Sequence, residues 1–339
     1  MSPSSRKRQR VLAVSPDRET IGYIYAPIQE RLARVEGRLR DMANVNFPFL
    51  SDLLSHVYCS SGKRMRPAIT LLASGFHSHD ELKSEIMATA IELLHIATLI
   101  HDDTVDESDF RRGRTTISSM YGKDIAVLVG DYIFASSATL VCDIGHIGVI
   151  RKFSETIMDL SNGELRERIS TYDPEQSLDD YYTRIYSKTA SLFAVSGESA
   201  ATISGAPDEH VAALREYSYE LGMAFQIVDD ILDFEGDPEE FGKPVGSDLA
   251  HGIMTLPTFI ALERSNGSNP VKSFFEDRHN DKLLAEAVEM IRQPEIMSEA
   301  YSEASRRCDI AHQALKSIPR SPSRDSLELL LDYVVRRRW

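Results

Sequence analysis

Glycine and proline, the residues that most often interrupt helices, are scarce in this chain, with 18 glycines and 14 prolines among 339 residues. Long stretches therefore run without a strong helix breaker. Apolar and polar residues do not alternate over any useful length, so no β-sheet is expected. We expect an all-α fold, and the length allows one large domain or two ordinary ones.

Cysteine is also rare. The three cysteines, Cys59, Cys142 and Cys308, are far apart and odd in number. They suggest neither a disulfide framework nor a zinc site. A reducing compartment is therefore expected, and we place the protein in the cytoplasm.

The chain lacks a positive charge balance, because its formal net charge is −14 at pH 7. A nucleic-acid partner is not expected, since binding a phosphate backbone requires a basic surface. An acidic protein can still bind a small phosphorylated substrate if metal ions lie between its carboxylates and the phosphate oxygens.

Long hydrophobic runs are nearly missing as well. The exception is IAVLVGDYIFASSATLVC, residues 125–142, which contains Asp131 and several small residues. We interpret it as a buried core helix, so the protein is not expected to be integral to a membrane. The basic start MSPSSRKRQR is followed by no apolar stretch of signal-peptide length. Residues 1–19 are expected to form a disordered basic tail before a domain at 20–339.

Apolar residues at helical spacing predict most of the chain's structure. An amphipathic opening helix is expected over residues 20–58, and a helix restarts at Pro67 because proline suits a first helical turn. Residues 83–106 are apolar on nearly every face, as in a fully enclosed helix. Further helices are expected near residues 124–142, 148–170, 178–204, 208–235 and 250–265, with two or three more between 270 and 337.

Two acidic clusters of the same spacing each end an apolar run: Asp102, Asp103 and Asp106, then Asp229, Asp230 and Asp233. Positions four apart share a helix face, about 6 Å apart along the axis, so each cluster presents two carboxylates side by side. Like charges near apolar surroundings destabilise a helix unless a cation neutralises them. One such cluster could be a solvated helix end, but two favour magnesium, which binds one or two carboxylates together with phosphate oxygens.

Basic residues lie near both clusters in the sequence. Arg111 and Arg112 follow the first cluster, and a short glycine-containing loop holds Lys63, Arg64 and Arg66. Lysines also stand in SKTASLF and FGKPVGS. Guanidinium groups suit phosphate oxygens, and lysine supplies a point charge. The set predicts a pocket for two diphosphates, one held through metal ions and the other by arginine and lysine directly.

Six motifs carry a resemblance to a known family: GKRMRP, LLHIATLIHDDTVDESDFRRG, GDYIFA, YSKTASLF, FQIVDDILDF and GKPVGSDLAHGIMTLP. In order and spacing they resemble the trans-isoprenyl diphosphate synthases, the polyprenyl synthetase family, over roughly residues 20–339. The resemblance implies an all-helical bundle around a deep central cavity, usually a homodimer. It also implies a prenyltransferase that adds isopentenyl diphosphate to an allylic diphosphate, giving a product five carbons longer at each step.

The resemblance also assigns roles residue by residue. It implies magnesium, with three ions per active site, on Asp102, Asp103, Asp106, Asp229, Asp230 and Asp233, the last through water. The allylic substrate or its diphosphate would contact Arg111, Lys188, Thr189, Gln226 and Lys243. Isopentenyl diphosphate would be seated by Gly62, Lys63, Arg66, His95 and Arg112. On helical spacing alone, His95, Thr189 and Gln226 would be interpreted as core or capping residues.

Two positions depart from the family pattern. Ile253, in HGIMTLP, stands where many relatives have lysine, which puts one outer contact to the metal–diphosphate cluster in doubt. The loop at 60–62 reads Ser-Ser-Gly where two glycines are common. No essential acid is missing, so a degenerate, non-catalytic subunit is not the preferred interpretation.

Product length in this family depends on what blocks the cavity below the first acidic cluster. Successive helical turns are about 5.4 Å apart, near the length of one isoprene unit. The first layer before Asp102 is Ala97 and Thr98, both small, and Leu94, Ile91, Ala90 and Met87 follow at deeper turns. Small residues at 135–138 add to this space, although they would also allow close helix packing. We expect a medium or long product, roughly thirty to fifty carbons.

Three alternatives remain open. A shorter-chain synthase of the geranylgeranyl or farnesyl type would share all the motifs. A regulatory or non-catalytic subunit of a heteromeric synthase would be inactive alone. A class I terpene cyclase shares the fold and the first aspartate motif, but the intact DDILD and the GKRMRP loop count against it. The basic C-terminus RRRW is expected to be a solvated tail, with folding over the diphosphates as the alternative.

Overall fold

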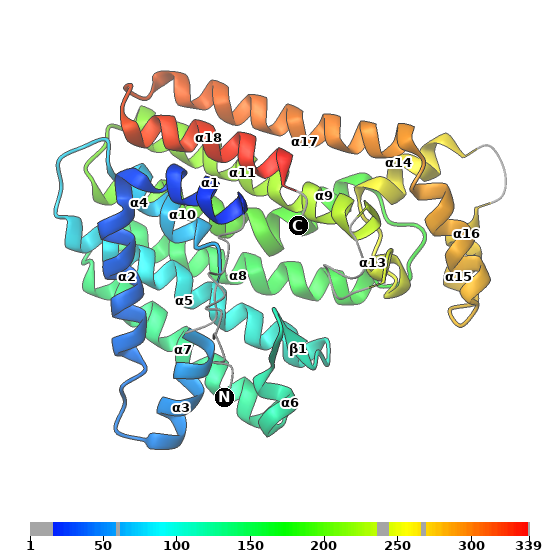
Figure 1. Cartoon of the computed structure of the whole chain (residues 1–339), viewed down its shortest axis with the longest axis horizontal. Coiled ribbons are helices and arrows are strands. Elements are labelled where there is room, and N and C mark those ends of the chain that lie inside the picture. The colour runs from blue at the N-terminus through cyan, green and yellow to red at the C-terminus, as the bar shows by residue number, and fades with distance from the viewer. Residues whose placement is uncertain (1–15, 59–61, 236–243, 266–268, 338–339) are drawn as a thin grey trace, which may run out of the picture.

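The computed structural model describes residues 16–58, 62–235, 244–265 and 269–337. Over these ranges the chain is a helical bundle, and the expected all-α class is confirmed (Figure 1). Lys243 and Cys59 lie outside the described residues, as does the predicted tail up to residue 15.

The elements up to the middle of the chain are, in order, α1 (Pro16–Ile24), η1 (Ala26–Ile28), α2 (Gln29–Met42), α3 (Pro48–Tyr58), α4 (Met65–Ser74), α5 (Glu81–Val105), β1 (Phe110–Arg111), β2 (Arg114–Thr115), α6 (Ile117–Tyr121), α7 (Lys123–Asp143) and α8 (Ile147–Ser170). The later elements are α9 (Leu178–Ile185), the π-helical turn η2 (Tyr186–Ala190), α10 (Ser191–Ile203), α11 (Asp208–Glu235), α13 (Ser247–Ala250), α14 (Leu256–Arg264), α15 (Pro270–Glu276), α16 (Asp281–Ile291), α17 (Pro294–Ala314), η3 (Leu315–Ser317) and α18 (Pro322–Arg336).

Two long helices, α5 and α11, form the centre of the bundle and end in the two acidic clusters. The N-terminus of α5 is capped by Asp80, whose side chain accepts a hydrogen bond from the Leu82 N–H at 3.1 Å. The helix is buried on every side, packed against α2, α4 and α7, so the prediction of an enclosed helix is confirmed. On the other side, α11 packs between α10 and α17.

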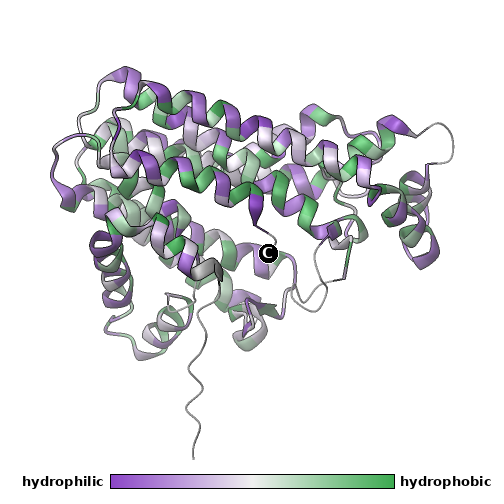
Figure 2. Cartoon of the chain, turned by 45° about the horizontal axis from the view of Figure 1, so that its top comes forward, coloured by the Kyte–Doolittle hydropathy of each residue, from purple (hydrophilic) through white to green (hydrophobic). Residues whose placement is uncertain are grey.

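Burial of apolar side chains divides the core into three clusters. The first joins α2, α4, α5, α7, α11 and α18, and the second gathers around the C-terminal half of α11 with α14 to α17. The third lies along α5, α7, α8 and α10 and includes Leu94, Ile91 and Phe153. Most helices in Figure 2 carry hydrophilic and hydrophobic residues in alternation along their length, as amphipathic helices do.

The predicted opening helix over residues 20–58 is wrong in its continuity. The chain breaks into α1, η1, α2 and α3. Pro27 falls in the first residues of η1 and Pro48 begins α3, because proline lacks the N–H that a helix interior needs. The helix expected over 250–265 begins only at Leu256, and four α-helices, not two or three, follow residue 270.

A short hairpin, which the sequence pattern did not predict, follows α5. Strands β1 and β2 pair antiparallel, with Arg111 opposite Arg114. The two connecting residues, Arg112 and Gly113, have φ of 50° and 75°. A two-residue turn of this kind requires positive φ at both positions. Strand β1 begins five residues after α5 ends, so it holds Arg111 near the C-terminal end of that helix.

Helix α7 is less enclosed than predicted. Among the described residues it is the one helix long and apolar enough to cross a membrane by length and composition, and 33% of its apolar segment is buried against other parts of the protein. One side packs against α5 and α6, while Val127, Leu128 and Tyr132 are exposed on the other. The apolar run is thus half core and half surface.

Close contact between α11 and the η2–α10 segment depends on Gly222. A Cβ atom at this position would lie 2.8 Å from Ala190 Cα and 2.9 Å from Phe193 Cβ. Neither neighbour can move away easily, because both are fully buried. The glycine therefore sets how closely the second acidic helix approaches the segment that carries Lys188.

Replacing Gly222 with alanine is expected to lower the free energy of unfolding by about 1–3 kcal/mol, because the added methyl group overpacks the contact. The control is Gly37→Ala in α2, where the nearest atom to a new Cβ is Arg40 Nη2 at 4.0 Å. That change should stabilise the protein by about 0.5–1 kcal/mol, since alanine loses less backbone entropy. Urea unfolding of both variants measures the difference, and equal stability would contradict the close approach.

Candidate active site

The first acidic cluster lies at the C-terminal end of α5. Asp103 is 6% exposed, and its Oδ1 accepts a hydrogen bond of 2.6 Å from Arg111 Nε, which the hairpin supplies. Asp106 Oδ1 lies 3.3 Å from Arg168 Nη2 on α8. Burial raises the pKa of Asp102 to about 7, with the charge of Lys188 opposing it. Each carboxylate of the cluster is thus near a cation from another element.

The second cluster lies in the last turns of α11. Asp230 is 2% exposed, and both of its oxygens accept hydrogen bonds, Oδ2 from Tyr181 Oη at 2.7 Å and Oδ1 from Gln226 Nε2 at 2.8 Å. Burial, helped by the charge of Asp248, raises the pKa of Asp230 to about 8. Asp233 Oδ2 accepts a hydrogen bond of 3.1 Å from the Asp248 N–H. This cluster is therefore held by neighbouring loops and helices.

Asp229 is half-buried and pairs with the C-terminal end of the chain. Its Oδ1 lies 2.8 Å from Arg337 Nη2. Arg337 is 7% exposed, donates to the Phe225 carbonyl, and stacks with its guanidinium carbon 3.7 Å from the Phe225 ring centroid. The prediction of a solvated tail is wrong for Arg337, because aromatic stacking and a carboxylate partner bury it. Residues 338–339 lie outside the described ranges.

Lys188 lies near Asp102 of the first cluster, in the π-helical turn η2. Its Nζ lies 2.5 Å from Glu167 Oε1 and 3.1 Å from Glu164 Oε2, both on α8. Burial lowers the pKa of Lys188, but the charges of Glu167, Glu164 and Asp102 outweigh it and raise the pKa overall. A π-turn inside a helix often marks a functional site, because it redirects one side chain.

Thr189 and Gln226 join Lys188 to the second cluster. Thr189 Oγ1 donates to Gln226 Oε1 at 2.7 Å, and Gln226 in turn donates to Asp230. Lys188, which lies near Asp102, is therefore the residue before a series of two hydrogen bonds that ends on Asp230. These hydrogen bonds connect the η2 segment, beside the first cluster, to the second cluster.

A third set of side chains is basic and surrounds the loop before α4. A Cβ on Gly62 would lie 2.7 Å from Arg112 Nη1, so the loop runs directly against that arginine. The Arg66 guanidinium lies 4.4 Å from the Phe193 ring centroid, and burial lowers the pKa of Arg66 to about 10. Lys63 Nζ lies 5.4 Å from the Tyr333 ring centroid.

Electrostatic contacts place this basic set beside both acidic clusters. Burial lowers the pKa of Arg66 and that of Arg112, and the charge of Asp229 opposes this at Arg66, as the charge of Asp103 does at Arg112. His95 lies in the same group, where burial and then the charges of Arg66 and Arg112 lower its pKa well below the usual value. His95 is therefore neutral at pH 7.

The predicted chain-length residues lie below the first cluster on α5. Ala97, Leu94 and Ile91 are fully buried, and Thr98 is half-buried with its Oγ1 donating to the His95 carbonyl at 2.8 Å. Leu94 and Ile91 belong to the third core cluster, whereas Ala97 packs in the first. The largest side chain of the third cluster is Phe153, on α8.

The profile of one family, described as polyprenyl synthetase, matches residues 47–291. The chain is 35% identical over 335 residues to solanesyl-diphosphate synthase 2 of Oryza sativa subsp. japonica, which covers 97% of this chain and 82% of that protein. It is 34% identical over 315 residues to heptaprenyl diphosphate synthase component 2 of Bacillus subtilis, with 93% and 90% covered.

A solved structure agrees with these sequence matches. The polyprenyl synthase from Caulobacter crescentus, complexed with calcium and isoprenyl diphosphate, superposes with a TM-score of 0.88 at 30% identity, covering 94% of this chain and 98% of that one. The chain belongs to the polyprenyl synthetase family. The predicted fold and the predicted reaction class, prenyl transfer that makes polyprenyl diphosphates, are confirmed.

The structure brings most predicted site residues of this synthase together, and it adds residues that the sequence reasoning missed. Predicted residue Lys243 lies outside the described ranges, and Ile253 is half-buried, with its N–H donating to the Asp248 carbonyl at 2.9 Å.

The site residues that the sequence did not predict are Glu92, Glu164, Glu167, Arg168, Tyr181, Asp248 and Arg337. The spacing of Glu164 and Glu167 on one helix face was the available signal for that pair.

Tyr181→Phe is expected to lower the turnover of the synthase about tenfold, because Asp230 loses one of the two donors that orient it. The matched control is Tyr182→Phe, since the adjacent hydroxyl donates to Glu303 at 3.3 Å, away from both clusters. Steady-state kinetics of the two variants make the comparison. A loss of equal size in both would show that Tyr181 only supports packing.

Proposed function

We propose that residues 20–339 form one synthase domain, which condenses isopentenyl diphosphate with an allylic diphosphate, repeatedly and head to tail. The observation that carries this proposal is the arrangement of two aspartate-ended helices, α5 and α11, around shared basic side chains. A phosphorylated substrate on each side of the reacting carbons would need this combination of carboxylates and cations.

Magnesium fits the carboxylates, with about three ions per site. No three His, Cys, Asp or Glu side chains among the described residues are grouped to hold one ion by themselves. Magnesium usually takes only one or two carboxylates and completes its shell with water and phosphate oxygens, so this geometry suits it. Asp102, Asp103, Asp106, Asp229 and Asp230 are the ligands we propose, and the hydrogen bonds that Asp103 and Asp230 accept would orient their carboxylates for that role. Asp233 would act through water.

The reaction needs charge to be stabilised on a departing diphosphate. The carbon–oxygen bond of the allylic diphosphate breaks, and its electron pair leaves with the diphosphate. The double bond of isopentenyl diphosphate attacks the allylic cation, and a proton then passes to an oxygen of the released diphosphate. The chemistry that bound magnesium supplies is Lewis-acid stabilisation of that leaving group.

The protein's own side chains do the rest of the work. Arg111 and Lys188 add fixed positive charge beside the first cluster, where negative charge grows as the bond breaks. Thr189 and Gln226 orient Asp230 and line the allylic side. Gly62, Lys63, Arg66, His95 and Arg112 seat the diphosphate of the second substrate. The apolar walls formed by α5, α7, α8 and α10 keep water from the cation. Lys243 remains a proposed contact to the allylic diphosphate.

A medium or long product is supported by the names of the relatives, which make solanesyl and heptaprenyl diphosphates. Below the first cluster, the growing chain would run past Ala97, Thr98, Leu94 and Ile91 toward Phe153. Each helical turn of about 5.4 Å accommodates roughly one isoprene unit. Phe153 is 2% exposed and would limit the final length, because it is the largest buried side chain of the third core cluster.

The assembly that we propose is a homodimer working in the cytoplasm. The exposed apolar side of α7, with Val127, Leu128 and Tyr132, continues onto Met120 and Tyr121 of α6. A second copy would cover this surface, since monomers rarely leave large apolar patches exposed. The two described cysteines, Cys142 and Cys308, are free, which suits a reducing compartment.

A second candidate function follows from one relative. The Bacillus subtilis protein is named component 2 of its synthase, so this chain could be the catalytic member of a two-protein enzyme. The aspartate clusters would then be intact but the chain would need a partner for full activity.

The purified chain, incubated with labelled isopentenyl diphosphate, magnesium and each allylic primer in turn, is expected to make polyprenyl diphosphates, with loss of activity when the divalent cations are chelated. Sizing the extracted products by chromatography gives the chain length. Product from an allylic diphosphate alone would indicate a cyclase. Inactivity of the chain alone, restored by a second protein, would favour the two-protein enzyme, and activity without divalent cations would contradict the proposal.

Ala97→Phe should shorten the product by two or more isoprene units, because it closes the first layer, while Phe153→Leu should lengthen it. The two changes act in opposite directions on one channel, so neither a general loss of activity nor of stability can mimic both. Product distributions from the same assay decide this. An unchanged distribution in Ala97→Phe would mean that the product does not run past this turn.

A further inference from the structure

A buried carboxylate on α5 has no role in the reaction as described so far. Glu92 is 5% exposed and lies three residues before His95 and ten before Asp102 on the same helix. A carboxylate that is buried without a catalytic role is expected to be paired with a cation.

The partner of Glu92 is Arg64, in the loop that leads into α4. Arg64 Nη1 lies 2.5 Å from Glu92 Oε1, and Arg64 Nη2 donates to the Tyr58 carbonyl at 3.2 Å. The Arg64 backbone has φ 49° and ψ 34°, in the left-handed region that residues with side chains seldom adopt. Such a conformation persists when surrounding contacts fix it. The ion pair to Glu92 therefore anchors the loop from Gly62 to Arg66.

The Glu92 charge also acts on the basic side chains that face the second substrate. It raises the pKa of Arg66 and of Arg112, against the larger effect of burial. Arg112 in turn lowers the pKa of Arg66, so these guanidinium groups repel each other when no anion lies between them. The negative charge of the Glu92 carboxylate reduces this repulsion between Arg66 and Arg112.

We propose that Glu92 is a positioning residue of the isopentenyl diphosphate site. Its carboxylate holds Arg64, and through Arg64 the backbone of residues 62–66, so that Lys63, Arg66 and Arg112 stay gathered before the diphosphate arrives. This inference rests on the proposed function. Its consequence is selective, because Lys188, Thr189 and Gln226 on the allylic side belong to other elements, η2 and α11, and do not depend on the loop at 62–66.

The test is Glu92→Gln, which keeps the size of the side chain and removes its charge. The KM for isopentenyl diphosphate is expected to rise about tenfold, which corresponds to about 1.4 kcal/mol of binding free energy. The KM for the allylic diphosphate should stay within twofold of the wild type and kcat within threefold. A structural role alone would not separate the two substrates.

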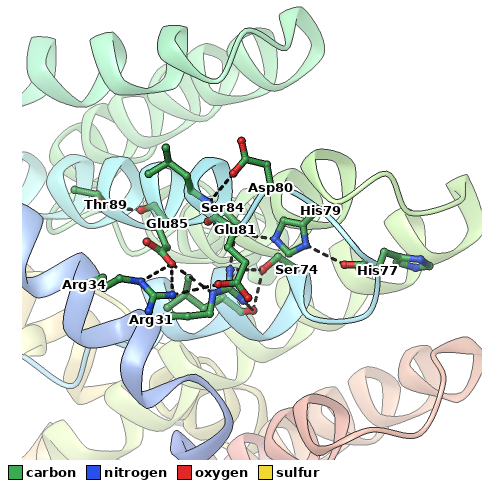
Figure 3. A network of polar contacts seen from close by, with 12 residues as sticks. Arg31, Arg34, Ser74, His77, His79, Asp80, Glu81, Ser84, Glu85 and Thr89 are labelled. Atoms are coloured by element: carbon green, nitrogen blue, oxygen red, sulfur yellow. Dashed lines mark hydrogen bonds and ion pairs between the residues drawn. The ribbon is translucent and has the colours of Figure 1, made fainter.

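The same helix provides a matched control. Glu85, seven residues earlier, is 4% exposed and pairs with Arg34 of α2, whose Nη2 lies 2.7 Å from Glu85 Oε1 (Figure 3). Glu85→Gln removes the charge of an equally buried carboxylate on α5, seven residues from Glu92, although its partner Arg34 is more exposed than Arg64. It is expected to lower the melting temperature and to leave both KM values unchanged.

The two KM values distinguish a positioning role of Glu92 from a purely structural one. If Glu92→Gln lowers the KM for isopentenyl diphosphate, or changes the two KM values as Glu85→Gln does, Glu92 is not a positioning residue. Should Glu92→Gln fail to fold, Glu92→Asp decides, because it keeps the charge but shortens the reach to Arg64. A rise of about threefold in the same KM supports the proposal, and no rise overturns it. Failure of the wild-type chain, alone and with any partner protein, to transfer prenyl groups would instead overturn the proposed function.

Discussion

The burial of carboxylates away from water is the constraint on which the rest of this structure depends. Burial raises the pKa of Asp102 to about 7 and that of Asp230 to about 8, which measures how unfavourable ionised aspartates are at these helix ends. The protein offsets the cost with cations from distant elements, such as Arg111 on the first cluster and Arg337 on the second. Because ionised carboxylates are unfavourable at these buried positions, a multivalent cation that binds them stabilises the site.

The helices hold these groups in place by packing rather than by local propensity. Helix α5 is enclosed by α2, α4 and α7, and Gly222 lets α11 lie tightly against η2, where Lys188 stands. The basic loop before α4 is fixed at the other side through Arg64 and Glu92. Rigid walls matter here, because an allylic cation must meet a double bond and not water.

Sequence reasoning could find α5, α11 and their aspartates, because an apolar run ending in paired carboxylates is a local signal. It also found the all-α class from the scarcity of glycine and proline. The contacts of Arg337 with Asp229 and of Tyr181 with Asp230 could not be found this way, since each joins residues far apart in the chain. The opening segment was misjudged because helical spacing continues across Pro48, where the helix itself cannot. The exposed side of α7 was missed, because composition does not tell which face a neighbour covers.

We propose that Asp102 and Asp229 bind one diphosphate through shared metal ions. A crystal structure of the protein with magnesium and an unreactive allylic thiolodiphosphate tests this most directly. We expect oxygens of Asp102 and of Asp229 each to lie about 2.0–2.1 Å from an ion that also contacts the one bound diphosphate. Ions confined to one cluster, or two clusters bound to separate ligands, would contradict it.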